Sequence, residues 1–180
     1  MKSVQEEIKK AAGDIGKELK NEQVANLQKS LQNATRGTKS PKDALGLTDA
    51  MVEGVYGQAY RLYNTGKYKD AIQLFKLLIM ISPTTPKFIM GLAASFHLLK
   101  DYKMAADTYV FLGVIDAENP ISFYHTSDCY VRMNDPVSAI VALNMAIKRC
   151  GDKPEFKVLK DRAILTLQSL KKNVEEGKVK

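Results

Sequence analysis

Apolar positions recur along the middle of the chain at an interval of 34 residues. Ala71, Ala105 and Ala139 stand at this spacing. Four further sets keep the same interval and the same small or bulky character: Val55, Ile89 and Phe123; Ala59, Ala93 and Ser127; Leu62, Phe96 and Tyr130; Phe75, Tyr109 and Leu143. The alanines suit positions where two helices cross closely, and the bulky residues fill the space toward the next unit. The pattern predicts three helical hairpins without insertions, over residues 52–85, 86–119 and 120–153.

Turn and cap residues support these boundaries. The segment Asn64-Thr65-Gly66 predicts the turn inside the first hairpin, and Ser82-Pro83 predicts its end. Helix starts are expected at Thr85-Pro86, Asn119-Pro120 and Asp135-Pro136, because the first residue can cap free amides and proline lacks an amide. A 34-residue helical hairpin is the tetratricopeptide period. We therefore predict an all-α tetratricopeptide-repeat solenoid.

Two flanking segments complete the predicted organisation. Residues 1–36 carry apolar residues at helical spacing and predict an amphipathic extension, and residues 37–50 predict a linker and helix start before the repeats at 51–151. Residues 154–180 predict a helix that caps the exposed end of the solenoid, with a frayed tail from Lys171.

Composition narrows the function classes. No apolar run approaches the roughly 18 residues that a membrane span needs, and the charged N-terminus does not match a signal peptide, so a cytoplasmic protein is expected. The net charge of +7 is spread as +2, +2 and +3 over residues 1–50, 51–151 and 152–180, whereas nucleic-acid binding usually needs a concentrated patch. Cys129 and Cys150 lack metal-site or disulfide spacing and are expected to be small buried residues.

The sequence offers little for catalysis. The two histidines, His97 and His125, stand in the first helices of different hairpins, and no phosphate-binding or hydrolase motif is present. His125, Asp128 and Cys129 share one helical face and could approach a metal, but this set is one ligand short. We expect neither an enzyme nor a cofactor.

Binding is the better-supported activity. In a solenoid of this kind the first helix of each hairpin lines a concave groove, reached from the second, fifth, ninth and twelfth positions of each repeat. The residues predicted to bind an extended apolar peptide are Tyr56, Tyr60, Tyr63, Met90, Ala94, His97, Tyr124, Asp128 and Val131. Tyrosine and methionine suit this task, since tyrosine combines apolar area with a hydroxyl and methionine adapts its shape. The alternative is that the tyrosines pack beneath the N-terminal helix. Tetratricopeptide adaptors that bind a C-terminal carboxylate place Lys and Asn at the fifth and ninth positions. This chain has Tyr56 and Tyr60 there, which disfavours that class of adaptor.

Several stretches resemble the class II chaperones of bacterial type III secretion, of the SycD/LcrH/IpgC type. They are YGQAYRLYNTGKYKDA (56–71), FIMGLAAS (88–95), ENP…FYHTSDCY (118–130) and KPEFKVLKDR (153–162). The resemblance covers roughly residues 48–170, and the KPEF element after a third repeat is its most specific part.

The resemblance implies a bacterial cytoplasmic chaperone. Such a chaperone binds a segment of a hydrophobic translocator with spaced proline and leucine anchors and keeps it from associating prematurely. It also implies a homodimer, for which Ile8, Ile15 and Leu19 are candidate contacts unless that stripe packs within the chain. Two other hypotheses remain: a generic tetratricopeptide adaptor, and a basic helical protein that binds nucleic acid or a membrane surface. We expect neither nucleic-acid binding nor membrane insertion.

Overall fold

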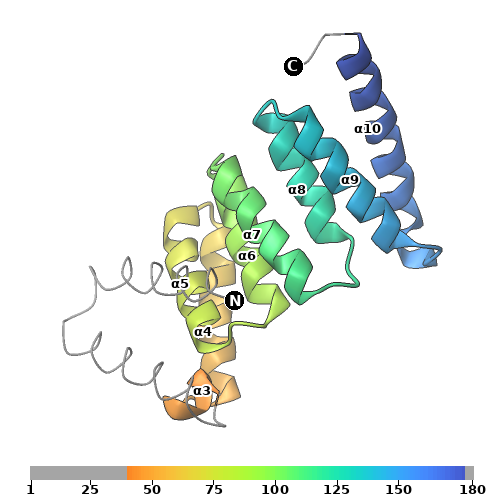
Figure 1. Cartoon of the computed structure of the whole chain (residues 1–180). Helices are drawn as coiled ribbons and strands as arrows, with labels where there is room; N and C mark the ends of the chain where they lie inside the picture. The colour runs from red at the N-terminus through yellow and green to blue at the C-terminus, as the bar shows by residue number, and fades with distance from the viewer. Residues whose placement is uncertain (1–39, 177–180) are drawn as a thin grey trace. The chain divides into compact units, whose positions relative to one another are not determined.

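The computed structural model describes residues 40–176 of the chain, which form helices joined by short turns (Figure 1). The expected N-terminal extension, with the candidate dimer contacts Ile8, Ile15 and Leu19, lies outside the described residues. The chain divides into two compact units, one up to Phe88 and one from Ile89 onward, and each is described by itself.

The first unit is a helical hairpin preceded by a short helix. Its elements are α3 (Pro41–Ala44), α4 (Asp49–Asn64), α5 (Tyr68–Ile81) and the first residues of α6 (Pro86–Leu98). Helices α4 and α5 pack against each other, and the small residues Ala59 and Ala71 are fully buried there. Phe75, four residues after Ala71, is also buried. The alanines and the bulky residue thus occupy the positions that the 34-residue pattern predicts.

The second unit continues the same arrangement. Beyond α6 its elements are α7 (Tyr102–Ile115), α8 (Ile121–Arg132), α9 (Pro136–Cys150), the 3-10 turn η1 (Pro154–Phe156) and α10 (Lys157–Glu175). Helix α8 packs against both α7 and α9, and α10 packs against α9 (Figure 1). Ala139 and Leu143 of α9 and Ala163 of α10 are fully buried. The all-α tetratricopeptide fold and its closing helix are confirmed.

The turn inside each hairpin repeats with the same backbone conformation. Gly66, Lys100 and Asn134, at intervals of 34 residues, all have positive φ, at 78°, 62° and 58°. The left-handed conformation reverses the chain at the end of each first helix, and it suits glycine and asparagine better than lysine. The backbone conformation at this position is therefore the same in all three hairpins, although the residue type differs.

Three details differ from the sequence expectations. The segment expected as a linker contains α3, because Ser40 caps it, its hydroxyl accepting from the amide of Asp43, and Pro41 occupies its first turn. The last helix is preceded by η1, so α10 begins at Lys157 rather than at Pro154. Helix α10 also continues to Glu175, past the point where a frayed tail was expected.

Among the described residues, no helix has both the length and the apolar character that a bilayer span requires.

Candidate functional site

Three tyrosines form a stacked row along α4. The rings of Tyr56 and Tyr60 have centroids 6.2 Å apart at an interplanar angle of 27°, and those of Tyr60 and Tyr63 are 6.4 Å apart at 20°. Their spacings of four and three residues place them on one helical face. Tyr60, in the middle, is 52% exposed. The structure therefore brings together the three tyrosines that the sequence predicts, and we call them the tyrosine row.

Other aromatic rings support both ends of the tyrosine row. Tyr56 contacts Phe75 of α5 and Phe88 of α6, with centroids 6.3 and 5.5 Å away. At the other end, Tyr63 meets the edge of Tyr68 at 5.8 Å, and partial burial raises the pKa of Tyr63. The outer rings are therefore held by the hairpin, while about half of the Tyr60 surface is exposed to solvent. Such a surface can accept an apolar side chain and offer a hydroxyl to a peptide group.

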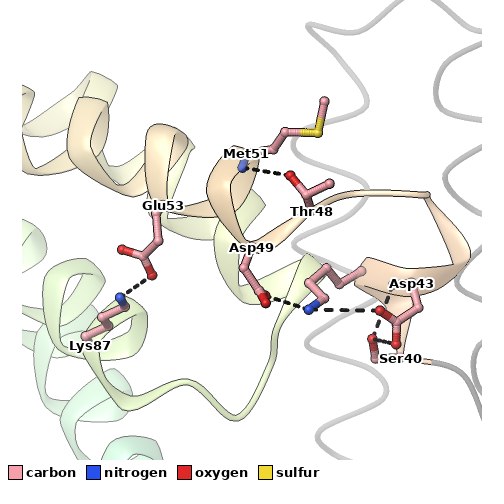
Figure 2. Close-up of polar contacts among 8 residues, drawn as sticks. Ser40, Asp43, Thr48, Asp49, Met51, Glu53 and Lys87 are labelled. Carbon is pink, nitrogen blue, oxygen red and sulfur yellow. Dashed lines mark hydrogen bonds and ion pairs between the residues drawn. The ribbon is translucent and has the colours of Figure 1, made fainter.

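A lysine covers one end of the tyrosine row. The Nζ of Lys87, at the start of α6, lies 4.6 Å from the centroid of Tyr56. It also pairs with the carboxylate of Glu53 (Figure 2). The cation–π contact and the ion pair hold Lys87 over the ring. Glu53 and Lys87 occupy the second position of successive repeats, 34 residues apart. Because equivalent positions of neighbouring repeats lie close together, this spacing could have indicated the contact. The second position is one of those predicted to reach the groove, but neither residue was among the predicted peptide contacts.

In the second unit, two predicted site residues meet in a charged cluster. The Nε2 of His97, on α6, lies 2.9 Å from Oδ2 of Asp128, on α8. The Nε of Arg132 donates to the same oxygen at 2.8 Å, and its guanidinium carbon lies 5.4 Å from the ring centroid of Tyr102. The hydrogen bond to Asp128 raises the pKa of Arg132. The sequence predicted His97 and Asp128 as separate groove positions but did not predict Arg132 as their partner.

His125 lies in an aromatic setting on α8. Its ring stacks on Tyr109 of α7, with centroids 5.1 Å apart and an angle of 22°, and Tyr124 meets its edge at 6.1 Å. Burial, reinforced by the neighbouring His97, lowers the pKa of His125. This ring therefore packs between helices as a neutral imidazole, while Tyr124, the predicted groove residue, is half-buried.

The remaining predicted positions differ in exposure. Met90 and Ala94, on α6, are half-buried, and Val131, on α8, is 41% exposed. Together with His97, Tyr124 and Asp128 they belong to the second unit, and the tyrosine row belongs to the first. Each unit thus carries part of the predicted set on its first helices.

The cluster weighed as a metal site has other partners. Within residues 40–176 no three His, Cys, Asp or Glu side chains are grouped as metal ligands would be. Asp128 binds His97 and Arg132, and Cys129 is fully buried. Burial raises the pKa of Cys129 to about 12, so its sulfur stays a thiol, whereas metals bind the thiolate. These residues support packing and a hydrogen-bond network.

Comparison with known proteins places the chain among related sequences. The family model described as tetratricopeptide repeat matches residues 52–83 and 86–119. The low calcium response locus protein H of Yersinia pseudotuberculosis is 29% identical over 120 residues, which cover 67% of this chain and 71% of that protein. The chaperone protein SicA of Salmonella typhimurium is 28% identical over 130 residues, covering 72% of this chain and 76% of SicA.

Solved structures agree with these sequence relatives. The type III secretion chaperone SycD of Yersinia enterocolitica, in complex with a peptide of the translocator YopD, matches with a TM-score of 0.65 and 28% identity over 69% of this chain and 95% of SycD. An alternative dimer of SycD matches with a TM-score of 0.66 and 28% identity, over 71% of this chain and 97% of that one. The repeat, the sequence relatives and the structural likeness agree: the chain carries tetratricopeptide repeats and is similar to type III secretion translocator chaperones.

Proposed function

We propose that this protein is a bacterial cytoplasmic chaperone that binds an extended segment of hydrophobic translocator proteins and keeps them soluble before secretion. The tyrosine row carries the proposal, because three stacked rings with an exposed centre offer a preformed apolar surface on a rigid helix. A rigid aromatic surface loses little conformational freedom when a ligand binds. The role is one of binding without a catalytic step, and the protein acts as a homodimer, as the family resemblance implies.

The chemistry of the tyrosine row favours an extended peptide with spaced apolar residues. A polyproline-like or extended segment has few conformations to lose, and its prolines and leucines can lie against aromatic faces. SycD, a relative, has been solved with a translocator peptide bound. We extend that binding class to this chain, with the tyrosine row, Met90, Ala94, His97, Tyr124, Asp128 and Val131 as the proposed contacts.

The test is affinity purification from the native host with the full chain and with Tyr56→Ala/Tyr60→Ala. We expect the parent to retain a protein with long hydrophobic segments and the variant to lose it, since a few aromatic residues usually dominate such interfaces. Tyr56→Phe/Tyr60→Phe is the matched control: it keeps both rings and isolates the contribution of the hydroxyl groups. A circular dichroism melt verifies that each variant is folded.

Other results would point elsewhere. Recovery of soluble partners without hydrophobic segments would favour the generic adaptor. Retention of the translocator by Tyr56→Ala/Tyr60→Ala would remove the tyrosine row from the binding site. Binding that collapses steeply with added salt would indicate an electrostatic partner such as nucleic acid.

A further inference from the structure

A cleft opens in the first unit beside the tyrosine row. It has a volume of about 430 Å³ and lies between α3, the first turns of α4 and the connection from α5 to α6. Its lining includes the buried side chains of Val52, Ile81 and Phe88. Pro41 and Pro83 add flat apolar walls. The cleft is therefore large enough to receive a side chain, and its lining combines apolar and polar groups.

Two ion pairs stand at the rim of this cleft. Lys42 pairs with Asp49 at 2.6 Å, and Glu53 pairs with Lys87; Figure 2 shows Asp49 and Glu53 on the same side of α4. Lys42 also lies 3.9 Å from the carboxylate of Asp43.

The two signs of charge differ in their exposure to solvent. The side chain of Asp49 is 89% exposed and that of its partner Lys42 is 25% exposed. The side chain of Glu53 is 56% exposed and that of Lys87 is 42% exposed. In each pair the acidic side chain is more exposed than the lysine side chain. The two acidic side chains are therefore open to an approaching ligand, although each one is paired with a lysine.

Hydroxyl groups on the connection before α6 add polar capacity. Ser82, Thr84 and Thr85 line the cleft, and their side chains make no hydrogen bond to other residues in the described part of the chain. Hydroxyls can both donate and accept, so they suit a peptide backbone.

The cleft is continuous with the tyrosine row. Lys87 and Phe88 both line the cleft. Lys87 also lies over Tyr56, and the ring of Phe88 lies 5.5 Å from the ring of Tyr56. A peptide lying on the tyrosine row would therefore pass Lys87 to reach the cleft.

We propose that this cleft binds a lysine or arginine side chain of the same peptide whose apolar residues lie on the tyrosine row. The methylene groups would pack on Val52 and Phe88, and the cation would meet the exposed carboxylates of Asp49 and Glu53. The inference rests on the proposed peptide-binding function and adds a requirement for a basic residue next to the apolar anchors.

The test begins with a display library of random 12-residue peptides selected on the full-length protein. The same selection is run on Asp49→Asn/Glu53→Gln, which keeps the shape of both side chains. Asp70→Asn/Asp107→Asn is the matched control, because both residues are exposed and neither lines the cleft. The best peptide is then synthesised with its basic residue unchanged or replaced by glutamine, and both forms are titrated by fluorescence anisotropy.

We expect the parent and the control to select apolar residues with a lysine or arginine at a fixed distance. Replacing that residue by glutamine should weaken binding about 3- to 10-fold on the parent and less than about 2-fold on Asp49→Asn/Glu53→Gln, since partly exposed ion pairs contribute modestly. Selection of apolar anchors without a basic preference, or an equal loss on both proteins, would overturn the inference.

A Tyr60→Ala arm separates this inference from the proposed function. Loss of peptide binding in Tyr60→Ala without any basic preference leaves the proposed function standing and the cleft inference wrong. Binding that survives Tyr60→Ala counts against the proposed function, and the glutamine comparison is then judged by itself. Faster trypsin cleavage after Arg36 or Lys39 in Asp49→Asn/Glu53→Gln, with unchanged selection, would assign the cleft to the chain's own N-terminal segment and overturn the inference.

Discussion

Gly113 of α7 lies directly against the ring of Phe123 on α8. A Cβ atom at Gly113 would be 2.6 Å from Cε2 and 2.9 Å from Cζ of that ring, and 3.0 Å from the hydroxyl oxygen of Ser122. The guanidinium carbon of Arg149 lies 4.3 Å from the centroid of the ring, and its Nη1 donates to the carbonyl of Gly113 at 2.8 Å. The ring of Phe123 thus lies between Gly113 and Arg149, and Arg149 prevents it from moving away from an added Cβ atom.

Gly113→Ala should therefore destabilise the protein despite the better helix propensity of alanine. Overpacking of this kind costs about 1–3 kcal/mol. Gly57→Ala is the control, because a Cβ at Gly57 meets nothing within 4 Å, and it should gain about 0.5–1 kcal/mol. Urea denaturation of both variants checks the pair. An unchanged midpoint for Gly113→Ala would mean that α7 and α8 separate without cost.

Lys67→Asp should stabilise the first hairpin. The second helices of the other hairpins are capped by Asp101 and Asp135, whose carboxylates accept from the amides of Met104 and Ser138, whereas Lys67 makes no such bond. An aspartate cap is typically worth about 1 kcal/mol, and it also replaces a cation at the positive end of the helix.

Denaturation midpoints of Lys67→Asp and Asp135→Ala provide the measurement. The first should rise and the second should fall. A fall for Lys67→Asp would indicate that the turn before α5 cannot place a short side chain over the free amides.

The hairpins were predictable because their packing repeats. Ala71 and Ala139 stand at a fixed distance along the chain and are both fully buried, so sequence spacing carries the geometry. The tyrosine row follows for the same reason, since spacings of four and three on one helix place side chains together. Helix α3 also had a signal, in the cap Ser40 followed by Pro41, but a single turn lacks the periodicity that identifies longer helices.

Contacts between elements were harder to predict. Gly113 stands where the other repeats have Ile79 and Ile147, which marks an exception in the sequence but does not identify Phe123 as its neighbour. The neighbour of Gly113 depends on which ring occupies the space beside it in the folded protein. The cluster of Arg132, His97 and Asp128 joins two helices through long side chains, each of which can reach several partners. The repeat pattern therefore predicted the positions of His97 and Asp128 but not the hydrogen bonds that connect the cluster.

His125 should make stability depend on pH near neutrality. Burial and the nearby His97 lower the pKa of His125 in the folded state, so the unfolded chain binds more protons at this residue. The free energy of unfolding should therefore decline as the pH falls through the unfolded-state pKa of about 6.5. Urea denaturation between pH 7.5 and 5.5 measures the slope.

The comparison for this slope is His125→Phe, which keeps the stacking on Tyr109 and cannot titrate. Its stability should vary less over the same interval. An equal slope in the parent and His125→Phe would assign the pH dependence to other groups. His97→Gln provides a second comparison, since it removes the neighbouring imidazole that contributes to the shift.

Both cysteines should be inert to thiol reagents in the folded protein. Cys129 and Cys150 are fully buried, and burial raises the pKa of Cys129 to about 12 and also raises that of Cys150. Reaction requires the thiolate, which is scarce at pH 8 for such a group, and access to the reagent. Ellman's reagent should therefore detect almost no thiol in the native protein and two per chain in guanidinium chloride. Cys129→Ala and Cys150→Ala identify the source of any native reaction, and rapid labelling of one cysteine at pH 8 would show that the helix covering it opens readily.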